Sequence, residues 1–322
     1  MADREPVGGP LRRKFREHEQ PWHTRKFDKV REWLQDADPQ IFGGKAPAEP
    51  NAFLAHTTAI LQQASEDLFG EKGMDEARAS MTKIPSRAFS DFEPDGALCV
   101  LLQSAFAYRR SQGGGPQWFE EQLSDKESAS QHLALFAGAE KALLNAGLIS
   151  RPKLFFSEDL PRVEAERLRG VAKAHNATVV QRVDQATHEI LPLTGGGAGK
   201  ASQIRLLAKQ GMIVKVHHGF YPESFDEWLP QSTAGKGRLE PPLPAPKLWK
   251  VTARFVQDLE RFNEWGVEED YLPCTPADLE EDDHGRAGAK RKRESLPSAP
   301  PAAVGGKAPR AADGGGAGAA GA

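Results

Sequence analysis

Cysteine, long apolar runs and an excess of one charge are all scarce in this sequence of 322 residues. The two cysteines, Cys99 and Cys274, lie far apart, which argues against a disulfide framework and against a zinc site built from cysteines. No stretch approaches the roughly eighteen continuous apolar residues that a membrane-spanning helix needs. The charged segment from Met1 to Glu19 lacks the apolar core of a signal peptide. We therefore expect a soluble, intracellular protein in a reducing compartment.

The charge balance and the hydrophobic content set two further limits. A formal net charge of -3 provides no global positive field for DNA, so direct DNA binding would depend on a local patch and stays open. Hydrophobic residues make up 39% of the chain, and this share is lowered by residues 273–322, which have almost no large apolar side chains. The part before Leu272 is apolar enough for roughly two or three small domains.

The first half of the chain has the periodicity of helices. Residues 1–21 are polar and basic and predict a disordered arm. Residues 22–150 predict a compact helical domain, because apolar side chains recur at helical spacing in several segments joined by short connections. The expected helices cover residues 25–37, 51–69, 98–108 and a segment after residues 124–127, where Ser-Asp-Lys-Glu has capping-box spacing.

The second half alternates strands with helices. Residues 151–193 predict a βαβ unit followed by a further strand, and residues 247–271 predict a strand at 249–252 and a helix at 254–265. The first unit lacks a closing strand and helix until Trp249, so we expect both segments to share one sheet. Residues 194–246 interrupt them with a Gly-rich stretch, a helix expected at 202–208 and a strand expected at 212–216. Residues 273–322 are predicted to be disordered.

Several sequence strings resemble the SMARCC/Moira family of SWI/SNF chromatin-remodelling subunits. They are GALCVLLQSAFAYR (96–109), LISRPKLFF (148–156), GFYPESFDEWLP (219–230), PPLPAPKLWKV (241–251) and RFNEWGVEEDY (261–271). The resemblance covers roughly residues 22–272, with the strings in the family's order. Members of that family continue into SWIRM and SANT domains and a coiled coil, whereas this chain ends in low-complexity sequence. A fragment, a truncated gene model and a short paralogue all remain open.

The resemblance implies an α+β multidomain protein with disordered termini. A MarR-like, winged-helix-related helical domain would occupy residues 22–150. An α/β BRCT domain would follow, split into residues 151–193 and 247–272 by a small chromo-like β insert with its linkers at 194–246. Phe255 then stands where BRCT domains usually carry a buried tryptophan, a tolerable change in a core.

The chromo-like insert raises the question of methyl-lysine recognition. Chromodomains hold the methylated ammonium in a cage of aromatic faces. Here the central cage tryptophan is replaced by His218, which leaves only Tyr221 and Trp228 as candidate walls. Tyr221 beside Pro222 fits turn packing equally well, and we expect Trp228 to close a small apolar core under Ile213 and Val216. We therefore expect no preference for trimethylated over unmodified lysine.

Two other segments resemble phosphate-binding motifs but lack residues that these motifs require. BRCT domains that bind phosphoserine use a hydroxyl residue followed by glycine, but Ser157 is followed by Glu158 and Asp159, which repel phosphate. The Gly-rich run at 194–201 has Thr194 where a P-loop needs its first glycine and Ala201 where it needs Ser or Thr. We expect a structural role for Ser157 and a plain loop at 194–201.

No pattern of catalytic residues or metal ligands stands out. The adjacent His217 and His218 point to opposite faces of a strand and have no Cys or His partners at ligand spacing. We find no Ser-His-Asp, paired-carboxylate or reactive-cysteine arrangement. The sequence therefore predicts a protein that is not an enzyme and has no cofactor or metal.

The leading functional hypothesis is a non-enzymatic scaffold. The chain would be a protein-interaction subunit of a SWI/SNF-type complex that supports nucleosome remodelling and transcription regulation. Its partners would be other SWI/SNF core subunits, with chromatin contacted indirectly and with no membrane or small-molecule substrate. The alternative is a stand-alone chromatin reader that binds histone tails or phosphopeptides.

We predict nuclear localisation that depends on the basic run Lys290, Arg291, Lys292 and Arg293. An extended basic peptide in an accessible tail suits the groove of an importin. Changing all four residues to alanine should reduce nuclear accumulation of a reporter fusion, as measured by fluorescence microscopy. A reporter that stays fully nuclear would show that this run is not the signal.

Overall fold

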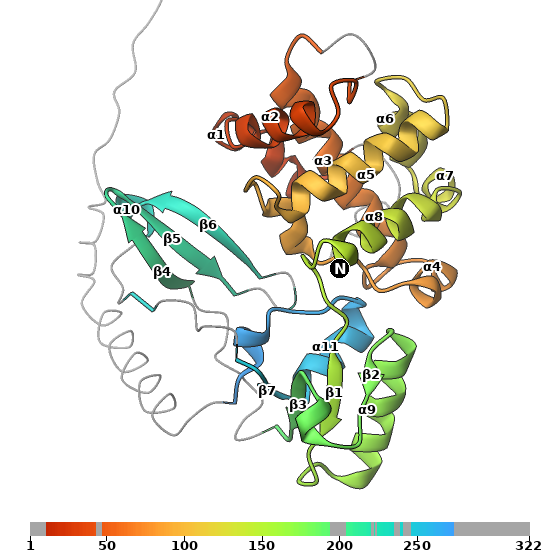
Figure 1. The fold of residues 1–322 in the computed structure, drawn as a ribbon, viewed down its shortest axis with the longest axis vertical. Coiled ribbons are helices and arrows are strands. Elements are labelled where there is room, and N and C mark those ends of the chain that lie inside the picture. The colour runs from red at the N-terminus through yellow and green to blue at the C-terminus, as the bar shows by residue number, and fades with distance from the viewer. Residues whose placement is uncertain are drawn as a thin grey trace, which may run out of the picture. The chain divides into compact units, whose positions relative to one another are not determined.

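The computed structural model of the protein describes residues 11–42, 47–193, 204–219, 222, 224–234, 239–240 and 246–273. Figure 1 shows how their helices and strands are arranged. The described residues all lie within one compact unit of the chain, Met1–Cys274. They form a helical module, an α/β module and a three-stranded insert, so the predicted α+β class is confirmed.

The helical module occupies the first part of the chain. It comprises η1 (Arg13–Glu19), α1 (Pro21–Thr24), α2 (Phe27–Ala37), α3 (Pro50–Phe69), α4 (Asp75–Ser80), η2 (Ser86–Ser90), α5 (Ala97–Ser111), α6 (Trp118–Leu123), α7 (Lys126–Ser130) and α8 (Leu133–Asn145). The long helix α3 buries residues around most of its circumference, including Leu54, Leu61 and Leu68. Each such leucine contributes roughly 1.5–3 kcal/mol when fully buried, which makes α3 the central helix of this core.

The start of the chain differs from the sequence prediction. The prediction of a disordered arm at residues 1–21 is wrong for residues 11–21. There η1 packs on α3, and Phe15 and His18 are buried. Arg12 fixes this segment further through an ion pair of 2.7 Å with Asp67. The backbone N–H of Arg12 also donates to the side chain of Gln63. Two anchoring side chains were too few to produce a visible apolar pattern.

The predicted capping box before α7 is also shifted. Ser124 ends α6, and the N-cap of α7 is Asp125, whose carboxylate accepts hydrogen bonds from the backbone N–H groups of Glu127 and Ser128. A carboxylate satisfies two otherwise free N–H groups and interacts favourably with the helix dipole. The sequence predicted one helix after residues 124–127, whereas the structure divides this stretch into the short α7 (Lys126–Ser130) and the longer α8 (Leu133–Asn145).

The α/β module contains four parallel strands. They are β1 (Lys153–Phe156), β2 (Thr178–Val179), β3 (His188–Leu191) and β7 (Trp249–Thr252), in the order β2-β1-β3-β7. Helix α9 (Arg162–Ala174) follows β1, and α11 (Arg254–Phe262) and η4 (Glu268–Tyr271) follow β7. Because β7 pairs with β3, the prediction that the two separated segments share one sheet is confirmed.

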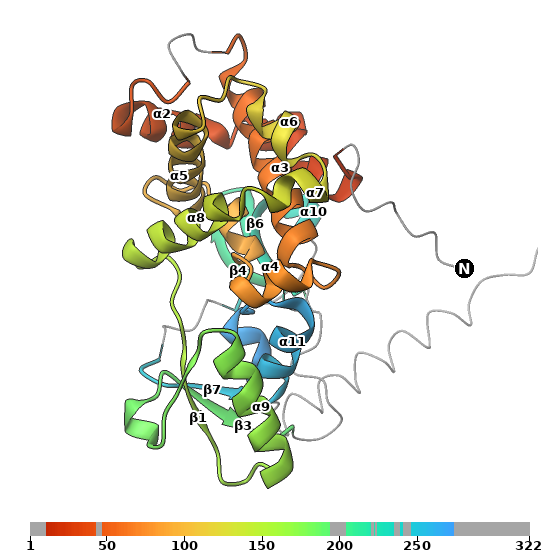
Figure 2. The ribbon, with the colours of Figure 1, turned by 90° about the vertical axis from the view of Figure 1, so that its right-hand side faces the viewer.

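The core of this module lies between the sheet and its helices. Helices α9 and α11 pack against each other (Figure 2). Leu154, Ile190 and Val251 from neighbouring strands are fully buried, as expected for a parallel sheet covered by helices. Phe255 of α11 is also buried, stacks on the ring of His188 and contacts Tyr271 edge to face. Phe255 is therefore a core residue of this module.

The insert is a three-stranded antiparallel sheet. It consists of β4 (Ile204–Gln210), β5 (Ile213–His218) and β6 (Phe225–Pro230), in the order β4-β5-β6, followed by the short α10 (Gln231–Ala234). The helix predicted at 202–208 is wrong for the described residues 204–208, since they belong to β4. Gly211, with φ of +60°, makes the tight turn into β5, a backbone conformation that suits glycine.

A β-bulge explains why this strand was mistaken for a helix. Leu206 and Leu207 are adjacent and both buried, which does not fit a strand with a strict two-residue period. The register with β5 shifts between Leu206 and Ala208, so the bulge absorbs one extra residue. The small core of the insert contains Leu206, Val214 and Val216.

A buried charged junction joins the helical module to the α/β module. The ammonium group of Lys83 lies 2.7 Å from the carboxylate of Glu264 and 2.6 Å from that of Glu66. Lys83 and Glu264 are only 4% and 1% exposed. Glu264 also accepts a hydrogen bond of 2.6 Å from the backbone N–H of Ser86.

Asn263 completes this junction from the end of α11. It adopts the left-handed conformation with φ of 55°, which ends the helix. Its side-chain NH2 group donates to the backbone carbonyl groups of Phe69 and Met81, and its backbone carbonyl accepts from the backbone N–H of Lys83. We call the cluster of Lys83, Glu66, Asn263 and Glu264 the module junction.

Replacing Glu264 with alanine should destabilise the protein by about 3–5 kcal/mol, because the change removes one partner of a buried ion pair. Urea denaturation followed by circular dichroism would measure the loss. The control is Glu71→Ala, which removes an ion pair between Glu71 and Arg261 across the same modules at exposed positions. That change should cost less than about 1 kcal/mol. Equal losses for the two variants would contradict a dominant role for Glu264.

Candidate functional site

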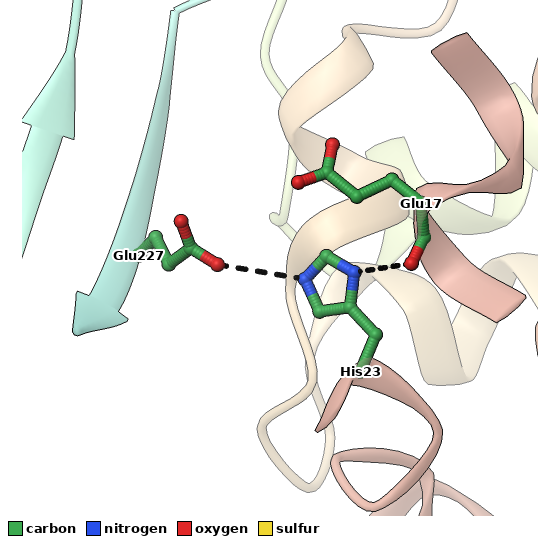
Figure 3. A group of neighbouring side chains, drawn as sticks. All are labelled: Glu17, His23 and Glu227. Atoms are coloured by element: carbon green, nitrogen blue, oxygen red, sulfur yellow. Dashed lines mark hydrogen bonds and ion pairs between the residues drawn. The ribbon is translucent and has the colours of Figure 1, made fainter. Parts of the chain in front are cut away.

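Charged side chains gather where β6 meets the first helices of the chain. His23 of α1 lies with its Nε2 3.6 Å from Oε1 of Glu227 on β6, and its Nδ1 lies 2.8 Å from the backbone carbonyl of Glu17 (Figure 3). The ammonium group of Lys26 is 3.5 Å from the same oxygen of Glu227. We call Glu17, His23, Lys26 and Glu227 the β6 cluster.

Burial changes the protonation behaviour of the β6 cluster. Desolvation, reinforced by the positive charge of Lys26, lowers the pKa of His23 to about 4. Desolvation and the nearby carboxylate of Glu227 raise the pKa of Glu17. Desolvation also lowers the pKa of Lys26, although Glu227 opposes this effect. His23 is therefore a neutral imidazole at physiological pH.

A second charged cluster joins the insert to the α/β module. His217 of β5 lies opposite Asp226 of β6 and is hydrogen-bonded to its carboxylate at 2.8 Å. On its other side, His217 is bonded at 3.0 Å to Asp270 of η4. Arg205 of β4 also binds Asp270 and its neighbour Glu269.

The two carboxylates determine the charge of His217. Burial alone would lower the pKa of this imidazole, but the hydrogen bonds to Asp226 and Asp270 outweigh burial and raise the pKa to about 9. His217 therefore donates from both ring nitrogens at neutral pH, one N–H to each carboxylate. We call His217, Asp226, Asp270 and Arg205 the imidazolium cluster.

A groove of about 770 Å³ runs beside these clusters. Side chains of both charges line it, including Lys26, Lys29, Lys215 and Asp226. Its apolar lining includes Trp228 of the insert. The groove thus offers a mixed surface of a kind that suits contact with another protein.

The structure separates the residues proposed for an aromatic cage. Trp228 pairs with Lys215 and His218 pairs with Phe225, so Trp228 and His218 lie on opposite faces of the sheet. Tyr221 lies outside the described residues. The expectation that Trp228 closes a core under Ile213 and Val216 is wrong, because Trp228 is 38% exposed and lies on the opposite face from Val216. On the face that carries Val216, His218 approaches Glu227, with 3.8 Å between Nε2 and Oε2.

The other residues considered in the sequence analysis do not belong to either cluster. The hydroxyl of Ser157 accepts a hydrogen bond from the backbone N–H of Asp159 and lies 3.3 Å from its carboxylate, which fits the expected structural role. The basic run Lys290–Arg293 and the Gly-rich run at 194–201 lie outside the described residues. Cys99 is buried, and desolvation together with Asp91 raises its pKa to about 11, which suppresses the reactive thiolate.

Sequence reasoning missed both charged clusters. Their members come from segments up to about two hundred residues apart, and no local spacing links Glu17 or His23 to Glu227, or His217 to Asp270. The only local signal was the density of titratable residues in Arg16-Glu-His-Glu19, inside the segment predicted to be a disordered arm, and in His23 just after it.

A comparison with known families matches the part of the chain that contains the helical module. Residues 5–149 match the family model described as a SWIRM-associated domain at the N-terminal. This match runs from before η1 to the end of α8, so it includes the segment that the sequence analysis treated as an arm. Such a domain is a feature of SWI/SNF-type chromatin-remodelling subunits, of which the SMARCC family is an example.

The match supports the broader part of the sequence prediction. The chain carries a domain typical of subunits of chromatin-remodelling complexes, which implies a chromatin-associated, nuclear protein. Among the residues that the structure describes, no helix has the length and apolar character needed to cross a membrane.

The imidazolium cluster generates a pH prediction. The folded pKa of His217, about 9, exceeds the value of 6.5 that holds without these contacts, so its stabilising effect is complete below pH 6.5. That effect should disappear as the pH rises through about 9. A His217→Gln variant should therefore have a lower urea midpoint than the parent at about pH 6, with a smaller difference at about pH 10. A difference that does not change with pH would show that His217 is neutral in the folded protein.

Proposed function

We propose that the chain is a non-enzymatic scaffold subunit of a SWI/SNF-type chromatin-remodelling complex. The observation that carries this proposal is the match of residues 5–149 to the SWIRM-associated domain, which coincides with the helical module. In this role the chain binds other core subunits and supports nucleosome remodelling without reacting with a substrate.

The internal contacts support a scaffold role. The module junction fixes the α/β module to the helical module, and the imidazolium cluster fixes the insert to the α/β module. Buried charged groups have strong geometric demands, so they favour one arrangement of neighbouring modules over alternatives. A chain that holds its modules in one arrangement can present a constant surface to several partners.

The finer domain assignments belong to the same proposal. The four-stranded sheet that is completed only after the insert supports a split BRCT domain at residues 151–193 and 247–272. The antiparallel sheet β4-β5-β6 supports a chromo-like insert. The helical module corresponds to the MarR-like domain, and the proposed family is SMARCC/Moira.

The alternative of a histone-tail reader has less support. A methyl-lysine cage needs aromatic faces around one cation, whereas His218 and Trp228 lie on opposite faces of the insert. A phosphopeptide site at Ser157 would place the phosphate beside the carboxylate of Asp159.

Co-sedimentation tests the scaffold proposal. In a glycerol gradient of nuclear extract, the tagged full chain should migrate with the remodelling ATPase and its core subunits. Digestion of the extract with nuclease before the gradient should leave this result unchanged, since the contacts are between proteins. If the chain leaves the complex after digestion, or migrates as a free protein, the scaffold proposal fails and chromatin binding becomes the better account.

A further inference from the structure

The β6 cluster has the geometry of an incomplete metal site. One ligand atom each from Glu17, His23 and Glu227 lies within 4.8 Å of the others. Figure 3 shows the carboxylate of Glu227 facing the imidazole of His23 from the strand, while the backbone carbonyl of Glu17 lies at the opposite edge of the ring and the carboxylate of Glu17 lies above it. The three residues come from η1, α1 and β6, so a bound ion would connect the start of the chain to the insert.

The hydrogen bond at Nδ1 determines what His23 presents to Glu227. Its Nδ1–H donates to the backbone carbonyl of Glu17 at 2.8 Å, so in the neutral ring Nε2 carries a lone pair. This lone pair faces Oε1 of Glu227, which is also an acceptor, at 3.6 Å. A carbonyl that accepts the other ring N–H is the usual outer partner of a metal-bound histidine, because it fixes the tautomer and the ring orientation.

The separation of these two atoms fits a tetrahedral ion. Zinc binds imidazole nitrogen and carboxylate oxygen at about 2.0–2.1 Å, which places two ligands of a tetrahedron about 3.4 Å apart. The observed 3.6 Å between Nε2 of His23 and Oε1 of Glu227 needs almost no adjustment. Glu17 is exposed and has a flexible side chain, so its carboxylate can close the remaining distance.

A cavity beside the cluster contains a buried nitrogen without a hydrogen-bond partner. It has a volume of about 170 Å³ and is lined by all three residues and by His18. His18 is 5% exposed, and its Nε2 is bonded to Gln62 at 2.9 Å. Its buried Nδ1 has no hydrogen-bond partner among the described residues. The unsatisfied nitrogen of a buried imidazole is therefore an independent sign that this cavity accommodates a ligand.

We propose that Glu17, His23 and Glu227 bind a divalent transition-metal ion of the zinc type, with water available as a fourth ligand. Lys26 competes with this ion, because its ammonium group neutralises Glu227 in the structure described here. Binding of the ion displaces this ammonium group toward solvent and fixes η1 and α1 to β6. The site does not depend on the proposed scaffold function.

Calorimetric titration of the metal-stripped full chain with Zn²⁺ tests the site. We expect about one equivalent to bind, with affinity reduced more than about tenfold by His23→Gln and by Glu227→Gln, since even outer-shell changes have effects of that size. Lys26→Met should strengthen binding by removing the competing cation. The matched control is His56→Gln, because His56 also lies between two carboxylates, Glu19 and Glu120, and should leave the affinity unchanged.

A Co²⁺ titration of the same variants identifies the ligands independently. Nitrogen and oxygen ligation in a tetrahedral site gives visible bands without the strong thiolate charge-transfer band that cysteine would produce. Thiolate absorption, binding that survives His23→Gln, or loss on His56→Gln would each overturn the proposal, as would the absence of Zn²⁺ binding. Circular dichroism confirms that each variant is folded. If His23→Gln unfolds, Glu227→Gln, which changes the ligand on β6 rather than the one on α1, decides the question.

Discussion

The buried pairing of Lys83 with Glu264 is the constraint on which the arrangement of the modules depends. An ammonium group at 4% exposure is tolerable only when carboxylates and hydrogen bonds replace its water. Glu66 and Glu264 approach it from different modules, so separating the modules would leave the charges without their partners. Asn263, whose left-handed backbone ends α11, adds hydrogen bonds at the same place.

Two histidines at the contacts of the insert have protonation states that differ for a clear physical reason. His217 lies between two carboxylates, and their attraction overcomes desolvation, so its pKa is raised to about 9. His23 is equally enclosed, but Lys26 adds repulsion to desolvation, so its pKa is lowered to about 4. One histidine therefore acts as a cation that joins two acids, whereas the other offers a lone pair. This difference distinguishes a structural contact from a proposed metal ligand.

The errors of the sequence analysis have specific causes. The strand at Ile204–Gln210 was predicted as a helix because two adjacent leucines violate the alternation of a strand, and a bulge resolves the conflict only once β5 is present. Residues 11–21 were predicted as a disordered arm because Phe15 and His18 are too few to form a periodic pattern. Trp228 was assigned to a core that forms on the other face of its sheet.

The sequence by itself determined the helical character of the first half, the strand–helix–strand segment after it and the return of the sheet at Trp249, because these features depend on local apolar periodicity. The sequence strings also supported a resemblance to the SMARCC/Moira family, and the match of residues 5–149 to the SWIRM-associated domain agrees with it for the helical module. Only the tertiary structure decided which charged groups meet. Glu17 and His23 approach Glu227, and His217 approaches Asp270, through folding of distant segments. The charge of each histidine then depends on these neighbours and on the water they exclude, and neither is encoded at the position of the residue itself.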